Sequence, residues 1–221
     1  MPLTGPAPLI VTLTGADHGT DLSKICALTR EYPRLEVGLL YSATPEGRNR
    51  YPSRPWLREA AQALNGRCAI HVCGTKARQE LLAGDLAGIT GYASRVQVNG
   101  RLMPEEVPGL ARLARVLITQ HTEANAQLVG LVIPNHQLLI DGSGGRGISP
   151  GSWTRPTTEK PVGFAGGLSP ANVLSQLQAI CSVDALPSWI DMESSLRNTD
   201  DWFDLGVCRE VLRLVTAGHE Q

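Results

Sequence analysis

The sequence lacks the features of several protein classes. It has 20 Lys and Arg residues against 21 Asp and Glu residues, and the net charge of −1 offers no basic field for nucleic acid. No stretch approaches the ~18 uncharged apolar residues that a membrane span needs, and the segment MPLTGPAPLIVTLTG at the N-terminus has no basic region before its apolar part. With 42 % hydrophobic residues, the chain is too apolar for disorder. We therefore expect a globular cytoplasmic protein that binds neither nucleic acid nor membrane.

Paired cysteines and a metal-binding pattern are missing as well. The five cysteines are odd in number and scattered, and none forms a CxxC motif, so a disulfide framework and a cysteine zinc site are excluded. His71, His121 and Asp141 do not have the spacing of a metal site on strand ends. We expect reduced, mostly buried thiols and no bound metal.

No linker divides the chain into parts. The 23 glycines and 15 prolines are spread in short clusters, and no Ser/Gly-rich or charged tract separates two halves. The prediction is one domain over residues 1–221.

What the sequence does contain is an alternation of short apolar runs and helix-like stretches. The runs cover residues 9–13, 35–41, 68–73, 95–98, 115–119, 137–140, 161–165 and 188–192. Because consecutive parallel strands need a crossover, this alternation predicts a parallel sheet covered by helices. Eight units of roughly 28 residues suit a (β/α)8 barrel. The alternative is an open doubly wound sheet, but the first run is followed by TGADHG and not by GxGxxG.

Helix signals lie between these runs. Residues typical of a helix N-terminus precede stretches with apolar residues at helical spacing. We predict helices after Thr20-Asp21, after Ser53 with Pro55, from Thr75 to about Gly84, after Ser169-Pro170, and over 201–217. Cys26 falls on the first of these helices beside Ile25 and Leu28, where we expect it to belong to the core.

Glycine and small polar residues gather late in the chain. In a (β/α)8 barrel the active site lies at the carboxyl ends of the strands, and a phosphate commonly binds the loops after the seventh and eighth strands. Here the sixth run is followed by DGSGGRG, the seventh by GGLSP and the eighth by ESS. Glycine lets the main chain approach a phosphate closely. The residues we expect to bind phosphate are Gly144, Gly145, Gly166, Gly167, Ser194 and Ser195.

These late segments resemble phosphoribosylanthranilate isomerase. The sixth-strand Asp141 with its GGRG loop and Trp153 resembles an aspartate, GGxG and tryptophan of that family, FAGGLSPANV looks like its AGGLxPxNV motif, and DMESS is similar to its DxSSG segment. The likeness is strong over about 138–196, while the N-terminal half is divergent. It implies a (β/α)8 barrel of the ribulose-phosphate-binding type. It also implies an isomerase of tryptophan biosynthesis that converts an aminoaldose to an aminoketose without a cofactor.

The resemblance implies roles for individual residues too. Asp141 matches the family's proton-abstracting aspartate, and Arg50 aligns with an arginine that receives the substrate carboxylate. The family's acid is a cysteine at the end of the first strand, where this chain has Thr14, and an ordinary hydroxyl is too weak an acid to replace a thiol. The candidates for that role are Asp17, His18, His121 and Glu193.

Glu193 is the preferred acid. It stands at a strand end, and two carboxylates across a barrel mouth can be driven to different pKa values by burial and repulsion. A carboxylate paired with an arginine is the other interpretation of this residue. We thus predict Asp141, Glu193 and Thr14 as the catalytic group.

Other functions stay open at this point. A related sugar-phosphate lyase or epimerase that acts on a different substrate would use the same phosphate-binding loops. A binding protein that holds a phosphorylated ligand without catalysis would use them too. In each case the expected partner is a small phosphorylated sugar. The sequence is compatible with a monomer or a homodimer.

Overall fold

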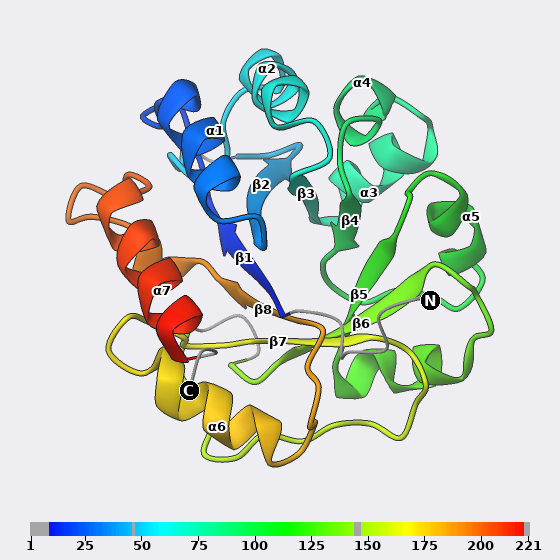
Figure 1. Ribbon diagram of the computed structural model, residues 1–221. Coiled ribbons are helices and arrows are strands. Elements are labelled where there is room, and N and C mark those ends of the chain that lie inside the picture. The colour runs from blue at the N-terminus through cyan, green and yellow to red at the C-terminus, as the bar shows by residue number, and fades with distance from the viewer. Residues whose placement is uncertain (1–8, 46, 144–146, 219–221) are drawn as a thin grey trace, which may run out of the picture.

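Eight parallel strands form a closed barrel in a computed structural model that describes residues 9–45, 47–143 and 147–218. Each strand pairs with the next along the chain, and β8 pairs with β1 (Figure 1). The strands are β1 (Ile10–Thr14), β2 (Leu35–Ser42), β3 (Cys68–Cys73), β4 (Arg95–Val98), β5 (Leu117–His121), β6 (His136–Asp141), β7 (Val162–Ala165) and β8 (Trp189–Met192). The predicted (β/α)8 barrel is therefore confirmed.

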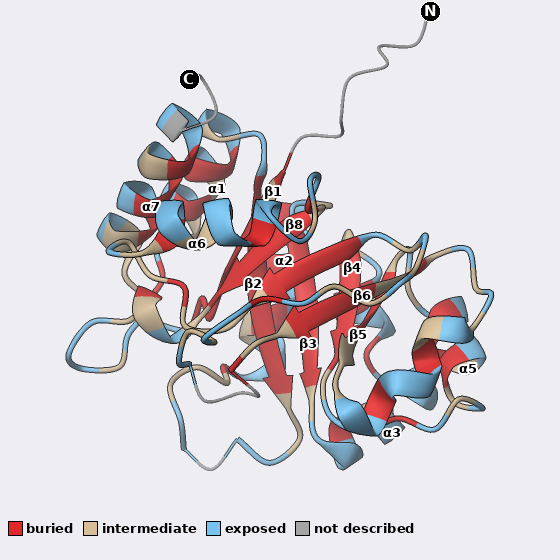
Figure 2. Ribbon diagram, turned by 90° about the horizontal axis from the view of Figure 1, so that it is seen from below, coloured by how far each residue is buried: buried red, intermediate tan, exposed pale blue. Residues whose placement is uncertain are grey.

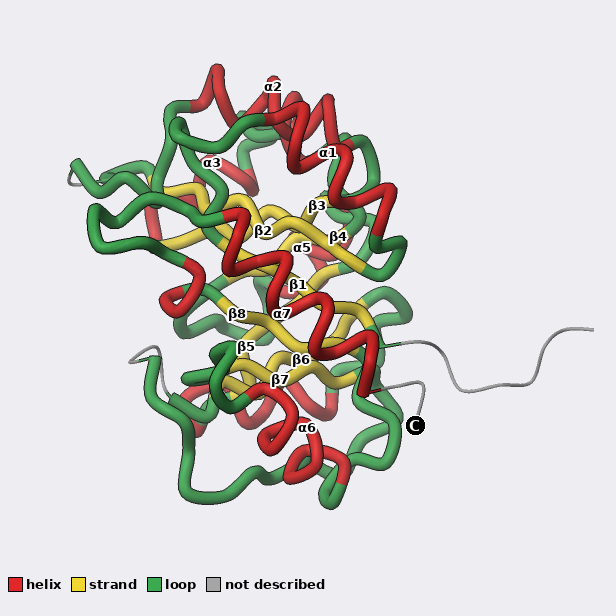
Figure 3. The backbone as a smooth tube through the Cα atoms, turned by 60° about the vertical axis from the view of Figure 1, so that its left-hand side comes forward, coloured by secondary structure: helices red, strands yellow, loops and turns green. Residues whose placement is uncertain are grey.

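The helices lie around the outside of the strands, as Figures 1 and 3 show from two directions. They are α1 (Leu22–Glu31), α2 (Arg54–Leu64), α3 (Thr75–Leu82), α4 (Ala87–Thr90), α5 (Val107–Arg112), α6 (Val173–Cys181) and α7 (Leu205–Gly218), with the 3-10 helices η1 (Glu123–Gly130) and η2 (Ser194–Leu196). Asp21 caps α1 by accepting hydrogen bonds from the backbone N–H groups of Ser23 and Lys24. Among the described residues, none of these helices has the length and apolar character needed to cross a membrane.

The helix predicted after Ser169-Pro170 is present as α6, which begins at Val173. Asn172 holds the turn before it by accepting a hydrogen bond from the Ser169 N–H and donating one to the Gly167 carbonyl. The predicted start of the last helix is wrong, because α7 begins at Leu205 and not at residue 201. Asp201 has φ of 58°, a left-handed conformation that an α-helix cannot contain.

The alternation of strands and helices is also less regular than expected. The connection between β5 and β6 contains η1 in place of an α-helix. Between β6 and β7 the chain runs from 142 to 161, and its described residues form no helix. This long connection contributes to the carboxyl end of the barrel.

The main core lies between the strands and the surrounding helices. Along each strand alternate side chains point outward into this core, as Val37 and Leu39 of β2 do, and they are fully buried. Figure 2 shows buried residues along the strands and exposed residues on the outer faces of the helices. Cys26 lies on α1, as predicted, and packs against this core with its thiol facing the Ala63 carbonyl of α2.

The barrel interior holds a buried ion pair beside a small apolar cluster. Ile118, Leu139 and Trp189 form the cluster. The Arg95 guanidinium pairs with Glu36, and it stacks on Trp189 at 4.4 Å from the ring centre. Burial alone would raise the pKa of Glu36, but the charge and hydrogen bonds of Arg95, with further bonds from Ser94 and Thr12, lower it instead. Both charges are thus compensated inside the barrel.

Candidate active site

A cavity of about 560 Å³ opens at the carboxyl ends of the strands, a size that suits a small-molecule ligand. Its lining combines inward-facing strand residues with the loops that follow β2, β6, β7 and β8. The sequence-predicted residues that line it are Arg50, Asp141, Gly166, Gly167, Glu193, Ser194 and Ser195. Gly144 and Gly145 lie outside the described residues.

Two carboxyl groups face this cavity at the same level of the barrel. Asp141 on β6 and Asp191 on β8 are both register partners of Ala165 on β7, so one small residue separates them. Neighbouring strands lie about 4.8 Å apart, which places the two backbones roughly 10 Å from each other. Ser143 donates two hydrogen bonds to Oδ1 of Asp141, from its N–H at 3.0 Å and from its hydroxyl at 2.7 Å, and these orient the carboxylate.

Asp191 is the cavity-lining carboxyl that the sequence analysis did not single out. It is almost fully buried, and burial raises the pKa of its carboxyl to about 8, with the negative charge of Glu193 acting in the same direction. Asp191 is therefore mostly protonated at neutral pH. The period-two alternation of the last strand, with Trp189 facing the interior, could have revealed that Asp191 faces inward as well. The burial that raises its pKa could not be seen in the sequence.

Thr14 acts on Asp191 directly. Its hydroxyl donates a 2.7 Å hydrogen bond to Asp191 Oδ1, which counteracts the rise in pKa. Gly38 makes room for this hydroxyl, because a Cβ at residue 38 would lie 2.0 Å from Thr14 Oγ1. Thr14 thus lies beneath the cavity as a partner of the acid.

We expect Thr14→Val to raise the pKa of Asp191 further above about 8, because the hydrogen bond that stabilises the ionised form is lost. The shift should be roughly half a unit to one unit. An NMR titration of the Asp191 carboxyl carbon measures it, and Thr14→Ser, which keeps the donor, should titrate as the wild type does. An unchanged or lowered pKa in Thr14→Val would contradict this role.

The loops after β6, β7 and β8 meet on one side of the cavity. A Cβ at Gly167, where φ is +62°, would lie 2.0 Å from the Ser149 N, so glycine is required for the two loops to touch. Ser195 donates its hydroxyl to the Leu168 carbonyl at 2.6 Å, and Ser194 approaches Gly147. The glycines of this region therefore first serve loop packing. The loops that they bring together are those predicted to hold a phosphate.

Arg50 and Glu193 are paired with each other at the mouth of the cavity. Arg50 donates to Glu193 Oε1 at 2.8 Å and to Asp201 Oδ1 at 3.3 Å. Partial burial raises the pKa of Glu193, while the charge and hydrogen bond of Arg50 counteract this rise. Arg50, which was predicted to bind a carboxylate of the substrate, thus already has two carboxylate partners within the chain.

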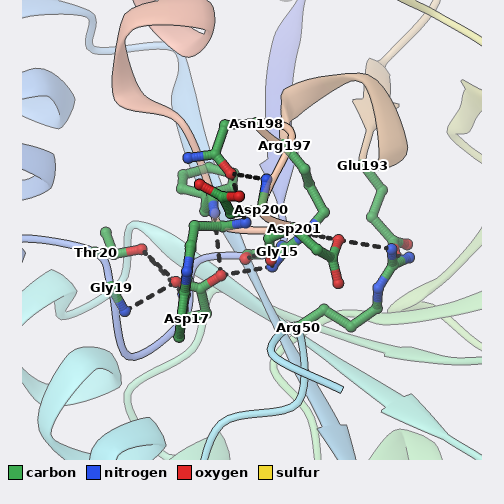
Figure 4. Close-up of polar contacts among 12 residues, drawn as sticks. Gly15, Asp17, Gly19, Thr20, Arg50, Glu193, Arg197, Asn198, Asp200 and Asp201 are labelled. Carbon is green, nitrogen blue, oxygen red and sulfur yellow. Dashed lines mark hydrogen bonds and ion pairs between the residues drawn. The ribbon is translucent and has the colours of Figure 1, made fainter.

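A second arginine ties the surrounding loops together (Figure 4). Arg197 donates to Asp17 Oδ2 at 2.6 Å, to Asp201 Oδ1 at 2.6 Å and to the Gly15 carbonyl at 2.8 Å. Asp17 is fully buried and also accepts from the Phe203 N–H. These contacts fix Asp17 as a structural residue that joins the loop after β1 to the one after β8.

The other candidate acids lie in different surroundings. His18 accepts a hydrogen bond from the Ser53 N–H and packs edge-on against Trp56, so it holds the start of α2. His121 stands at the end of β5, and desolvation lowers its pKa. Neither lines the cavity.

The wall formed by β3, β4 and β5 carries uncharged polar groups. Gln97 Nε2 lies 3.3 Å from His71 Nδ1 and donates to Asn99 Oδ1 at 2.9 Å, and Asn99 in turn approaches the Cys73 thiol at 3.3 Å. Burial lowers the pKa of His71 to about 4 and raises the pKa of Cys73 to about 12, so both are neutral near pH 7. Gln120 completes this wall.

No group of three or more His, Cys, Asp or Glu side chains within the described parts of the chain is arranged to hold a metal ion. All five cysteines are free thiols. The chemistry available at this site from the chain's own residues is proton transfer by carboxyl groups and hydrogen bonding by the loops.

The closed strand order defines the class of protein: a (β/α)8 barrel, here with a cavity at the carboxyl ends of its strands. Solved structures of phosphoribosylanthranilate isomerase are similar over nearly their whole length. The enzyme from Thermus thermophilus is 19% identical with a TM-score of 0.65, and covers 95% of this chain and 99% of its own. The enzyme from Thermotoga maritima is 17% identical with a TM-score of 0.66, and covers 95% and 100%.

A further isomerase structure was determined in complex with reduced 1-(o-carboxyphenylamino)-1-deoxyribulose 5-phosphate. It is 18% identical with a TM-score of 0.66, and covers 93% of this chain and 97% of its own. No protein-family model matches the sequence, and no curated protein sequence matches it. At these identities the similarity establishes the fold, while the activity has to be argued from the site.

Proposed function

We propose that this protein is an isomerase that converts a phosphorylated aminoaldose to the corresponding aminoketose by acid–base catalysis without a cofactor. The observation that carries this proposal is the pair of inward carboxyls, Asp141 and Asp191, at one level of the barrel mouth with only Ala165 between them. The similar structure that holds a carboxyphenylamino ribulose phosphate supports a ligand of this chemical class.

The reaction needs an acid and a base. Asp191, protonated at neutral pH, gives its proton to the ring oxygen as the C1–O bond breaks and the nitrogen lone pair forms a C=N bond. Asp141 then removes the C2 proton to give the enolamine, which becomes the ketose when C1 gains a proton and the C2 hydroxyl loses one. Asp191 thus replaces Glu193 as the preferred acid, because Glu193 is engaged by Arg50.

The phosphate of such a substrate would lie at the loops after β6, β7 and β8. Backbone N–H groups near Gly166 and Gly167 and the region Ser194–Ser195 are the donors we propose. Gly144 and Gly145 remain part of the prediction from the sequence. This placement puts the sugar ring over Ala165, between the two carboxyls.

The test uses ribose 5-phosphate condensed with an aromatic amine. Condensation with 2-aminobenzoate or with 2-aminobenzamide gives two N-(5-phosphoribosyl)arylamines, and the product to be measured is the 1-arylamino-1-deoxyketose. We expect turnover of at least one substrate, with a rate reduced about a hundredfold or more in Asp141→Asn while the reduced product still binds. Glu159→Gln, an exposed change just before β7, is the control and should leave the rate unchanged.

Two outcomes decide against the proposal. Binding of the reduced products without turnover by the wild type would favour the non-catalytic phosphate-ligand protein. Equal affinity for the same ligands without their phosphate would show that the loops after β6, β7 and β8 do not hold a phosphate.

A further inference from the structure

The wall of the cavity opposite the loops after β7 and β8 differs from them in composition. In the closed strand order, β3 and β4 lie across the barrel from β7 and β8. A ligand whose phosphate lies at the β7 and β8 loops therefore extends its other end toward Cys73, Gln97, Asn99 and Gln120. These side chains offer uncharged donors and acceptors.

Two arginines, Arg48 and Arg50, line the cavity, and Arg50 is paired within the chain. Its guanidinium donates to both Glu193 and Asp201. Asp201 is shared with Arg197, which also pairs with Asp17, so this group of two arginines and three carboxylates has a formal net charge of −1. A carboxylate on the ligand could reach Arg50 only by displacing Glu193, and it would then face that like charge in a partly desolvated site.

We propose that Glu193 is a specificity-determining residue that makes this site select a substrate whose nitrogen substituent is uncharged and hydrogen-bonding, such as a carboxamide, and reject an aromatic carboxylate. The proposal rests on the proposed function for the position of the phosphate. It adds the chemical class of the second substituent. Glu193 rejects the wrong ligand by an unfavourable charge, while the amide side chains of β4 and β5 bind the right one.

Two matched ligands test the proposal by calorimetry. They are the reduced arylamino-deoxyribulose 5-phosphates made from 2-aminobenzamide and from 2-aminobenzoate, which differ only in carboxamide against carboxylate. We expect the wild type to bind the carboxamide at least tenfold more tightly. In Glu193→Gln the carboxylate ligand should gain about tenfold or more as Arg50 becomes available, while the carboxamide affinity changes less than threefold.

Further variants separate specificity from folding. The side chain in Glu193→Ser is too short to contact Arg50, so this variant should bind the carboxylate ligand more tightly, as Glu193→Gln does. Asp201→Asn leaves Glu193 on Arg50 and should change the ratio less. Arg50→Met should remove the gain that Glu193→Gln gives to the carboxylate ligand. Thermal melting of each variant shows that the fold is retained.

The result that overturns the proposal is a wild type that binds the carboxylate ligand as tightly as the carboxamide, or a ratio that Glu193→Gln and Glu193→Ser both leave unchanged. Because the readout is binding, it is independent of turnover. If the carboxamide ligand binds more tightly as expected but neither substrate is turned over, only the proposed reaction is wrong. If a substrate is turned over but the carboxylate ligand binds more tightly, only the proposed specificity is wrong. If neither ligand binds, both are wrong.

Discussion

Asp191→Asn is expected to reduce the rate of isomerisation by about 10²–10⁴, because the amide cannot donate the proton that opens the sugar ring. The substitution is nearly isosteric, and the amide can still accept a hydrogen bond from Thr14 at the Oδ1 position. We therefore expect the reduced product to bind within a few fold of the wild type. Steady-state rates on the two arylamine substrates and calorimetry with the reduced product measure both quantities.

The same variant should be more stable than the wild type above about pH 4. The pKa of Asp191 is raised from 3.8 to about 8 on folding, so between these values the folded protein keeps a proton that the unfolded chain releases. Stability from this group is present at low pH and falls as the pH rises toward about 8, at about 1.4 kcal/mol per pH unit. The difference at pH 7 is on the order of a few kcal/mol.

Urea unfolding at pH 4, 6 and 8 checks the sign. The free energy of unfolding of Asp191→Asn, relative to the wild type, should increase from pH 4 to pH 8. A variant that loses stability at every pH, with an unchanged rate, would show that Asp191 serves only the packing of the barrel.

Arg95→Met should destabilise the fold by about 3–5 kcal/mol, because it leaves the Glu36 carboxylate buried in the barrel without its counter-ion. In the wild type the pKa of Glu36 is lowered, so its contribution to stability is present above the unfolded pKa and is lost as the pH falls through the folded one. In the variant the uncompensated charge can be relieved by protonation. The destabilisation should therefore shrink toward pH 4.

The double variant Arg95→Met with Glu36→Leu is the matched control. Removing both charges should recover most of the lost stability, since an apolar pair of similar volume often replaces a buried ion pair without cost. Urea unfolding of the two single variants and the double variant gives the coupling between them. If the loss of unfolding free energy in the double variant equals the sum of the losses in the two single variants, the unpaired charge is not the cause of the destabilisation.

The distribution of residues along the chain was enough to predict the barrel. Alternating apolar runs and helix-like stretches gave eight strands whose ends agree with β1–β8 to within about two residues, since strand register in a buried sheet follows the hydrophobic pattern. Ends of helices were less well predicted. α7 starts at Leu205 and not at the predicted residue 201, because the left-handed Asp201 cannot belong to an α-helix, and the apolar periodicity carries no signal of that conformation.

For the candidate site, the sequence by itself predicted which strand ends surround the cavity: Asp141, Gly166, Gly167 and the segment 191–195 all line it. Tertiary structure alone decided what two of these residues do. The pKa of Asp191 is raised because the closed barrel removes its carboxyl from water, and Glu193 is held by an arginine 143 residues away in the chain. Burial and long-range pairing set protonation and charge, and both arise only when distant strands close the barrel.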